Sequence, residues 1–278
     1  MVTRSRKPQG PPKRDRSGYY ATPAGRLMSV TTILSNGIPK PALMHWAAFE
    51  AAQCAVDNIP ALVRARGEEA RREARQWIQH AAERKRDSAA NLGTVIHGFL
   101  EAQVLGQPTP EFTDEQRPFV EAFGRFLDDW QPEYEATELT VANTEVGYAG
   151  TLDFIAHLPA IGSGLLMGDY KTGKSVYPEV GLQLAAYRRA TVGWTRPDGV
   201  EVKPPATVGA VVLHVRPEGM PGGEPRGYAL HPVKTDDDVF ARFLEAKGIA
   251  EATRKDGLFD SILGDCLQAP ATTTKDVA

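Results

Sequence analysis

The sequence predicts an α/β fold in which a helical N-terminal region precedes a core that contains a β-sheet. Apolar residues recur at helical spacing as far as Trp130, whereas from Tyr134 onward the pattern becomes strand-like. A continuous apolar run over Thr207–Val215 indicates a strand that is buried on both faces, as in a sheet covered by helices. Because strands and helices alternate after Tyr134, we expect one α/β core behind the helical region.

The first elements are predicted as follows. Residues 1–28 are basic and contain several prolines and glycines, so they are expected to form a disordered basic arm, either a solvated tail or an aid to DNA binding. Ser29–Leu34 is a short β-branched run that suits a strand or the approach to a helix. Ala42–Val56 has a helical pattern, with Pro41 at its start and Pro60 as its break.

Three further helical segments follow. Ala61–Asp87 carries eight Lys or Arg against five Asp or Glu, so it is either a solvated helical face or a helix that lies along a nucleic-acid backbone. A helix is expected over Ser88–Leu105, with Ser88 as its N-cap and Gly106 as its stop. Another is expected over Thr113–Trp130. Its apolar face is expected to pack in the core and consists of Phe119, Phe123, Phe126, Leu127 and Trp130.

The second half of the chain alternates between strands and helices. The predicted elements are strands over Tyr134–Ala142, Tyr148–His157 and Gly164–Lys171, a helix over Pro178–Thr191, strands over Thr207–Val215 and Arg226–Val233, the latter at a sheet edge, and a helix over Asp236–Lys255. We therefore divide the chain into the arm (1–28), a helical region (29–133), a core (134–267) and a disordered tail (268–278). Residues 29–267 are expected to form one structural domain.

Composition excludes several classes of protein. The net charge is −3, so any nucleic-acid contact must come from local basic patches. Cys54 and Cys266 lie far apart in the sequence, which argues against a disulfide framework, a structural zinc and an iron–sulfur cluster and favours a reduced, cytoplasmic setting. No apolar run is long enough for a membrane span, and no apolar segment of a secretory signal follows the basic N-terminus.

Two acids and a lysine fall on consecutive predicted strands. Asp169 and Lys171 are two residues apart, so on an extended strand their side chains leave the same face. Asp153 and Asp169 each follow apolar residues of their strands, where an unpaired carboxylate would be costly. Carboxylates that hold a hard divalent cation beside an ammonium group suit an enzyme that cleaves phosphodiesters.

Four ordered motifs give this arrangement a family likeness. Gly93–His97 (GTVIH) precedes Gly150–Asp153 (GTLD), Asp169–Lys174 (DYKTGK) and a helix with Gln183 and Tyr187 in Gln-x-x-x-Tyr spacing. The chain thereby resembles the PD-(D/E)XK nuclease superfamily, in particular the RecB-type nuclease domain and related phage exonucleases, over roughly Ser29 to Val215. The stretches that begin at Ser29 and Pro41 also resemble phage members.

The resemblance implies a restriction-endonuclease-like core, with a central mixed β-sheet flanked by helices, and a metal-dependent deoxyribonuclease. The implied activity is that of an exonuclease that acts on DNA ends or single strands. The implied role is in DNA recombination, replication or processing, in a phage or its host. Related enzymes tie their termini with a four-cysteine iron–sulfur cluster, which this chain lacks. A helicase or single-strand annealing protein would have to be supplied separately.

The resemblance also implies a role for each residue of the site. Asp153 and Asp169 would hold Mg²⁺ or Mn²⁺, with His97 and the backbone carbonyl of Tyr170 as further ligands. Lys171 would position the attacking water and stabilise charge on the phosphate.

Other candidates lie around this group. Gln183 and Tyr187 would line the site, while Glu138 and Glu145 are weaker candidates for a second metal or for the shell behind the first. Lys174 and Ser175 would lie near the substrate phosphate. Without motif support, the remaining histidines are expected to be structural or surface residues: His45, His80, His157, His214 and His231.

Two alternatives stand beside the nuclease hypothesis. Gly168–Ser175 satisfies the phosphate-loop pattern G-x-x-x-x-G-K-[ST] of nucleotide hydrolases. Against it, Asp169 would place a carboxylate among the phosphate-binding amides, and Pro178 puts the helix start too late. A nuclease fold that binds DNA ends without cutting is the second alternative, although both acids and the lysine are present.

Overall fold

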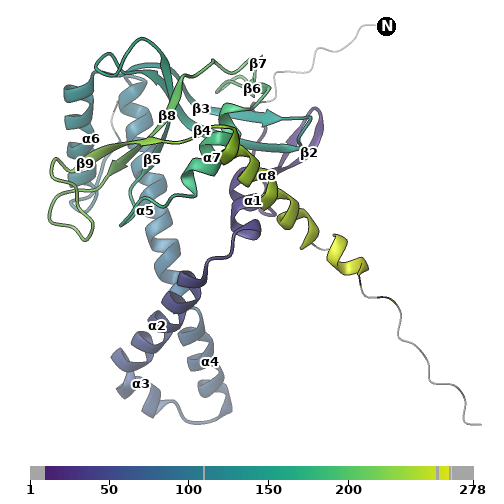
Figure 1. Cartoon of the computed structure of the whole chain (residues 1–278). Helices are drawn as coiled ribbons and strands as arrows, with labels where there is room; N and C mark the ends of the chain where they lie inside the picture. The colour runs from purple at the N-terminus through teal and green to yellow at the C-terminus, as the bar shows by residue number, and fades with distance from the viewer. Residues whose placement is uncertain (1–9, 109, 255–256, 263, 265–278) are drawn as a thin grey trace, which may run out of the picture.

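The computed structural model describes residues 10–108, 110–254, 257–262 and 264, so the first nine residues and the expected tail at 268–278 lie outside the described residues. Its centre is a nine-stranded mixed sheet, in which the main path runs β7-β6-β3-β4-β5-β8-β9 and β2 also pairs with β4 (Figure 1). The strands are β1 (Tyr19–Thr22), β2 (Gly25–Ser29), β3 (Glu133–Asn143), β4 (Tyr148–His157), β5 (Leu165–Lys171), β6 (Val192–Trp194), β7 (Glu201–Val202), β8 (Gly209–Val215) and β9 (Tyr228–Val233).

Helices cover both faces of the sheet, which confirms the expected α/β class (Figure 1). The helices are α1 (Val30–Gly37), α2 (Pro41–Asp57), α3 (Ile59–Arg64), α4 (Glu68–Gln79), α5 (Ala81–Val104), α6 (Arg117–Trp130), α7 (Val180–Arg188) and α8 (Asp237–Ala252), followed by a 3₁₀ turn over Leu258–Ser261. One buried core joins the sheet to α1, α7 and α8, and a second joins it to α5 and α6. Alternation along β5 sends Met167 into the first core and Leu166 and Tyr170 into the second.

The N-terminal arm is the first correction. The expectation of a disordered arm over residues 1–28 is wrong from residue 10 onward, because β1 and β2 form an antiparallel hairpin. This hairpin joins the main sheet through two parallel pairs, Met28 with Tyr148 and Ser29 with Ala149. Ser29 then caps α1 by accepting a hydrogen bond from the Thr32 amide, so Ser29–Leu34 ends a strand and begins a helix.

The helical region projects from the core as α2, α3, α4 and the first turns of α5 (Figure 1). The charged segment 61–87 is not one helix, because Gly67 at φ 87° separates α3 from α4 and His80 separates α4 from α5. The expected start of a helix at Ser88 is also wrong. Instead, α5 runs unbroken from Ala81, and Ser88 lies in its interior.

The later elements that the sequence predicts are present in the structure and differ only in their ends. α6 begins at Arg117 rather than Thr113, whose backbone amide donates to Gln116 Oε1 at 2.9 Å. The strands β3, β4, β5, β8 and β9 fall where strands were expected, and β9 lies at an edge of the sheet. The short strands β6 and β7 were not anticipated. No helix among the described residues is long and apolar enough to cross a membrane.

We predict that Gly168→Ala destabilises the fold. A Cβ at this position would lie 1.7 Å from Cζ of Phe154, whose ring stacks on Tyr170 at a centroid distance of 4.7 Å. Overpacking of this kind costs about 1–3 kcal/mol of the free energy of unfolding, which denaturant unfolding would measure.

Gly124→Ala is the matched control, because a Cβ at this position in α6 meets no atom within 4 Å. Alanine should be neutral there or stabilise the helix by up to about 1 kcal/mol. Equal effects of the two substitutions would contradict the packing argument.

Candidate active site

The site begins where β4 and β5 separate. Their pairing ends at Phe154 with Gly168, so the next residues toward the site, Asp153 and Asp169, face one another across a widening gap. In that gap Oδ2 of Asp153 accepts a hydrogen bond from the Tyr170 amide at 2.7 Å. The carboxylate therefore takes the place of a strand partner, and its position is fixed by the backbone of β5.

Asp169 is held from two sides. Its side chain is only 4 % exposed, and Nζ of Lys171 donates to its Oδ2. From α7, Nε2 of Gln183 donates to Oδ1 of Asp169 at 2.8 Å. Lys171 itself is 37 % exposed, so its ammonium group lies at the boundary between the buried carboxylate and solvent.

His97 reaches the same place from the opposite face of the sheet. Its Nδ1 lies 3.8 Å from Oδ2 of Asp153, and its ring meets the ring of Tyr170 edge-on at 5.6 Å. One turn earlier on α5, a Cβ at Gly93 would lie 3.4 Å from Oγ1 of Thr172. The glycine of the histidine motif therefore allows α5 to cross close to the end of β5.

Glu138 completes the group from β3. The residues on either side of it pair with Phe154 and Leu152, which puts Glu138 opposite Asp153. Its φ of 48° is in the left-handed region that non-glycine residues rarely adopt within a strand. Backbone strain of this kind clusters at functional sites, and here it accompanies a half-buried carboxylate.

Three of these side chains are grouped as metal ligands would be. One ligand atom each from His97, Glu138 and Asp153 lies within 4.8 Å of the other two. Asp169 is outside this set, and Lys171 and Gln183 each donate a hydrogen bond to one of its oxygens, so its role as a direct ligand would require these side chains to move. An imidazole and two carboxylates suit Mn²⁺ or Mg²⁺, and the imidazole favours Mn²⁺.

The electrostatics also favour a cation. Burial, with the nearby charge of Asp169, raises the pKa of Asp153 to about 6, although His97 and Lys171 oppose the shift. Burial and the charge of Asp153 raise the pKa of Glu138 to about 7. Burial acts to lower the pKa of Lys171, but Asp169 and Asp153 outweigh it and the net pKa is raised. Lys171 is therefore an ammonium group paired with Asp169, whereas burial and mutual repulsion leave Asp153 and Glu138 with raised pKa values that a bound cation would lower.

Tyr187 has a packing role. A Cβ at Gly150 would lie 2.3 Å from Cε1 and 2.7 Å from the hydroxyl oxygen of Tyr187. The ring thus lies directly against the glycine of the GTLD motif, three residues before Asp153. The Gln-x-x-x-Tyr spacing on α7 thus lets Gln183 bind Asp169 of β5 while Tyr187 packs against Gly150 of β4.

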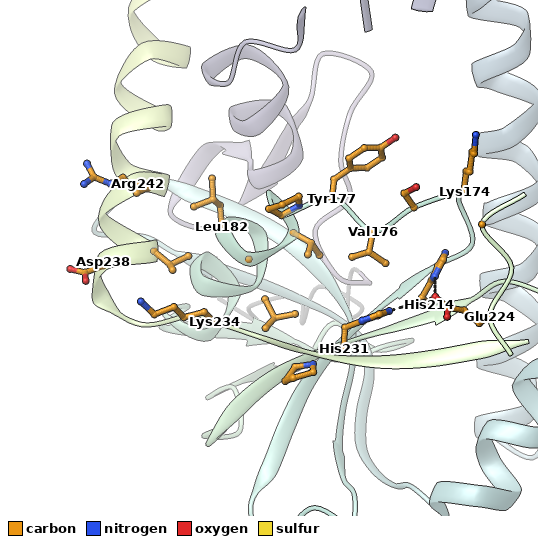
Figure 2. Close-up of a pocket in the computed structure, with 18 residues that line it drawn as sticks. Lys174, Val176, Tyr177, Leu182, His214, Glu224, His231, Lys234, Asp238 and Arg242 are labelled. Carbon is orange, nitrogen blue, oxygen red and sulfur yellow. Dashed lines mark hydrogen bonds and ion pairs between the residues drawn. The ribbon is translucent and has the colours of Figure 1, made fainter. Parts of the chain in front are cut away.

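The loop after β5 carries Lys174 and Ser175. Ser175 lines a pocket of about 200 Å³ together with Lys171, Gln183 and Lys40, whereas Lys174 lines a larger neighbouring pocket (Figure 2). Gly168 lies inside β5, and the next helix begins only at Val180. A phosphate loop requires a helix that begins at the lysine, so this segment does not have that geometry.

The sequence analysis missed two residues near the site, Arg196 and Glu101, and one of its candidates, Glu145, lies away from the site. Arg196 lies 3.5 Å from Glu138 and 3.9 Å from Glu101. For Glu101 the sequence does hold a signal, because it follows His97 by four residues and therefore lies on the same face of the helix. Arg196 comes from the β6–β7 loop and has no sequence signal. Glu145, a weaker candidate for a second metal or for the shell behind the first, lies exposed in the β3–β4 turn and outside the ligand set.

We predict that Asp153→Asn stabilises the metal-free protein. The folded-state pKa of about 6 exceeds the ordinary 3.8, so the folded protein holds this proton more tightly than the unfolded chain. The free energy of unfolding therefore falls as pH rises through this window. Above it, asparagine should raise the free energy of unfolding by roughly 1–3 kcal/mol, as denaturant unfolding in EDTA would show.

The advantage of Asp153→Asn should vanish near pH 4, and the variant should lose the rise in Tm that Mn²⁺ gives the unaltered protein. Glu145→Gln is the control, because this exposed carboxylate lies outside the ligand set. A variant less stable than the unaltered protein at pH 8 would contradict the electrostatic argument.

No protein-family model matches the chain, and no curated protein matches it either.

Proposed function

We propose that the protein is a metal-dependent deoxyribonuclease that hydrolyses phosphodiester bonds at DNA ends or in single strands. The observation that carries this proposal is the convergence of Asp153, Asp169, Lys171 and His97 from three separate motifs. Two buried carboxylates and an ammonium group beside an open pocket suit phosphoryl chemistry better than they suit a structural role.

Each side chain would contribute a distinct interaction. Asp153, His97 and Glu138 would hold Mg²⁺ or Mn²⁺, which when bound lowers the pKa of water and neutralises phosphate oxygens. Lys171, protonated and partly exposed, would donate to a phosphate oxygen where negative charge develops. Gln183 would keep Asp169 oriented when Lys171 turns toward the substrate.

A DNA-end-binding module that does not cut is the competing function. It would not need the strained backbone of Glu138 or the raised pKa values of Glu138 and Asp153. These features cost stability and are more readily explained by a bound cation. As a nuclease, the protein would work with a helicase or a single-strand annealing protein supplied separately, in recombination, replication or processing of DNA.

Cleavage of end-labelled and covalently closed DNA, single- and double-stranded, would test the activity. We expect loss of linear DNA with Mn²⁺ or Mg²⁺, none in EDTA, and closed circles spared. Lys171→Ala should lower kcat by on the order of 10²–10³, because it removes a donor to the developing charge. Asp153→Asn should abolish metal-dependent cleavage.

Lys203→Ala is the matched control, since this exposed lysine precedes β8 and is not part of the site. Binding of DNA ends without cleavage under either metal would favour the non-cutting module. Cleavage that survives in Lys171→Ala would place the chemistry elsewhere.

We also predict salt-sensitive DNA binding through the helical region. Several of its basic residues are paired with acids, such as Arg71 with Glu68, but Arg64, Arg66 and Arg75 form no salt bridge within the described part of the chain. If these three contact phosphates, replacing them with alanine should reduce the slope of log K against log salt by about 2–3. A binding constant that does not respond to salt would exclude this surface as the DNA contact.

A further inference from the structure

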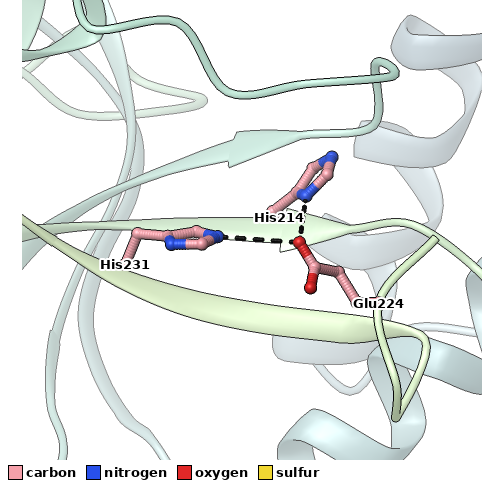
Figure 3. Close-up of side chains that lie close together, drawn as sticks. All are labelled: His214, Glu224 and His231. Carbon is pink, nitrogen blue, oxygen red and sulfur yellow. Dashed lines mark hydrogen bonds and ion pairs between the residues drawn. The ribbon is translucent and has the colours of Figure 1, made fainter. Parts of the chain in front are cut away.

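A second cluster of potential metal ligands lies on the other side of the loop that follows β5. His214 is on β8, His231 is on β9, and Glu224 is in the connection between them (Figure 3). His214 pairs with Ala229, so His231, two residues further along β9, is its diagonal neighbour on the same face of the sheet. The antiparallel register thus brings both imidazoles to one spot, and none of the three residues belongs to the candidate active site.

The ligand atoms converge on one carboxylate oxygen. Oε1 of Glu224 lies 2.7 Å from Nδ1 of His214 and 3.7 Å from Nε2 of His231 (Figure 3), and one ligand atom from each of the three residues lies within 4.8 Å of the other two. The backbone of Glu224 is fixed, because its amide donates to the Arg216 carbonyl at 2.9 Å. The carboxylate is therefore directed at the histidines by the loop.

The hydrogen bond on the far side of His214 determines what Nδ1 can do. Nε2 lies 2.8 Å from the Gly173 carbonyl, which can only accept, so Nε2 carries the proton. Nδ1 is thus the nitrogen of His214 that faces Oε1 of Glu224. At 2.7 Å the two atoms share a proton, and once that proton is released both are free to bind a cation.

We propose that His214, Glu224 and His231 form a binding site for Zn²⁺, with Nδ1, Oε1 and Nε2 as the ligand atoms. Two imidazole nitrogens and one carboxylate oxygen are a ligand set that Zn²⁺ accepts in three of its four tetrahedral positions. The carbonyl of Gly173 has the usual role of the group that fixes the tautomer of a ligating histidine. The side chain of His231 is 46 % exposed, which leaves the fourth position open to water.

The site would fasten the loop that carries Lys174. The Gly173 carbonyl is bound to His214, the Thr172 carbonyl accepts from Arg216 at 3.0 Å, and Gly222 lies so close to Lys174 that a Cβ would be 2.0 Å from its carbonyl oxygen. Zinc would join Glu224 in the β8–β9 loop to both strands and so hold this packing together. The two distant cysteines argued against a zinc site with cysteine ligands, and this argument does not apply here because the proposed ligands are two histidines and a glutamate.

The cluster also borders the larger pocket, of about 730 Å³, which is lined by the start of α7 and by α8 (Figure 2). Lys174, Lys234 and Arg242 surround this pocket, and Asp238 is the acid on its α8 side. The open coordination position therefore lies beside a surface on which cationic groups outnumber acids. This inference stands apart from the proposed nuclease activity, since it uses different residues.

Zn²⁺ titration of the full-length Asp153→Asn protein, which lacks a ligand of the candidate active site, would test the proposal. We expect one equivalent of tightly bound Zn²⁺, and a Co²⁺ visible spectrum of tetrahedral type. In the same background, His231→Gln and Glu224→Gln should each weaken Zn²⁺ binding by on the order of tenfold or more. Replacing a residue that only hydrogen-bonds to a metal ligand already has an effect of this size, so replacing a ligand should have at least as large an effect. Both positions retain solvent exposure, so these variants should fold, which Tm in EDTA would check.

His45→Gln is the matched control, because this histidine is exposed on α2 and away from both clusters. It should leave the affinity unchanged. Zn²⁺ affinity that is equal in His231→Gln, Glu224→Gln and His45→Gln would overturn the proposal. Loss of Zn²⁺ binding in Asp153→Asn alone would also overturn it, since zinc would then occupy the candidate active site. Neither readout depends on DNA cleavage, so failure of the nuclease proposal would be seen separately.

Discussion

The separation of β4 from β5 is the constraint on which the candidate active site depends. Once the strands part, the Tyr170 amide has no carbonyl partner, and the Asp153 carboxylate satisfies it at 2.7 Å. A buried amide without a partner would cost free energy, so this bond holds Asp153 in place although burial disfavours its charge. The position of the carboxylate is thus set by strand geometry, and its high pKa is a consequence of that position.

The glycines of the motifs make the site possible by letting other elements approach. Gly150 admits the ring of Tyr187, Gly168 admits the ring of Phe154, and Gly93 lies near Thr172. Each contact joins a helix or strand that carries one functional side chain to the strand that carries another. The spacing of residues within the motifs therefore reflects packing as much as chemistry, which explains why a tyrosine expected to line the site is a buried packing residue.

The sequence predicted the elements whose signal is local and missed those that depend on distant partners. Strand periodicity located β4 and β8 within two residues, because their apolar patterns follow from burial. The hairpin of β1 and β2 escaped notice because polar and glycine residues surround it, and its order comes from pairing with Tyr148 and Ala149. Glu138 was only a weak candidate, since a left-handed residue within a strand leaves no pattern in the sequence.

His214 and His231 show the same limit, because only antiparallel register brings residues so far apart in the sequence together. The chain that leaves β5 is then held at two nearby points. Lys171 is bound to Asp169, and the Gly173 carbonyl is bound to His214. Lys171 and Gly173 are only two residues apart, so the candidate active site and the His214 cluster hold the same short segment of backbone. The two clusters are thus neighbours along the chain, although no proposed zinc ligand belongs to the candidate active site.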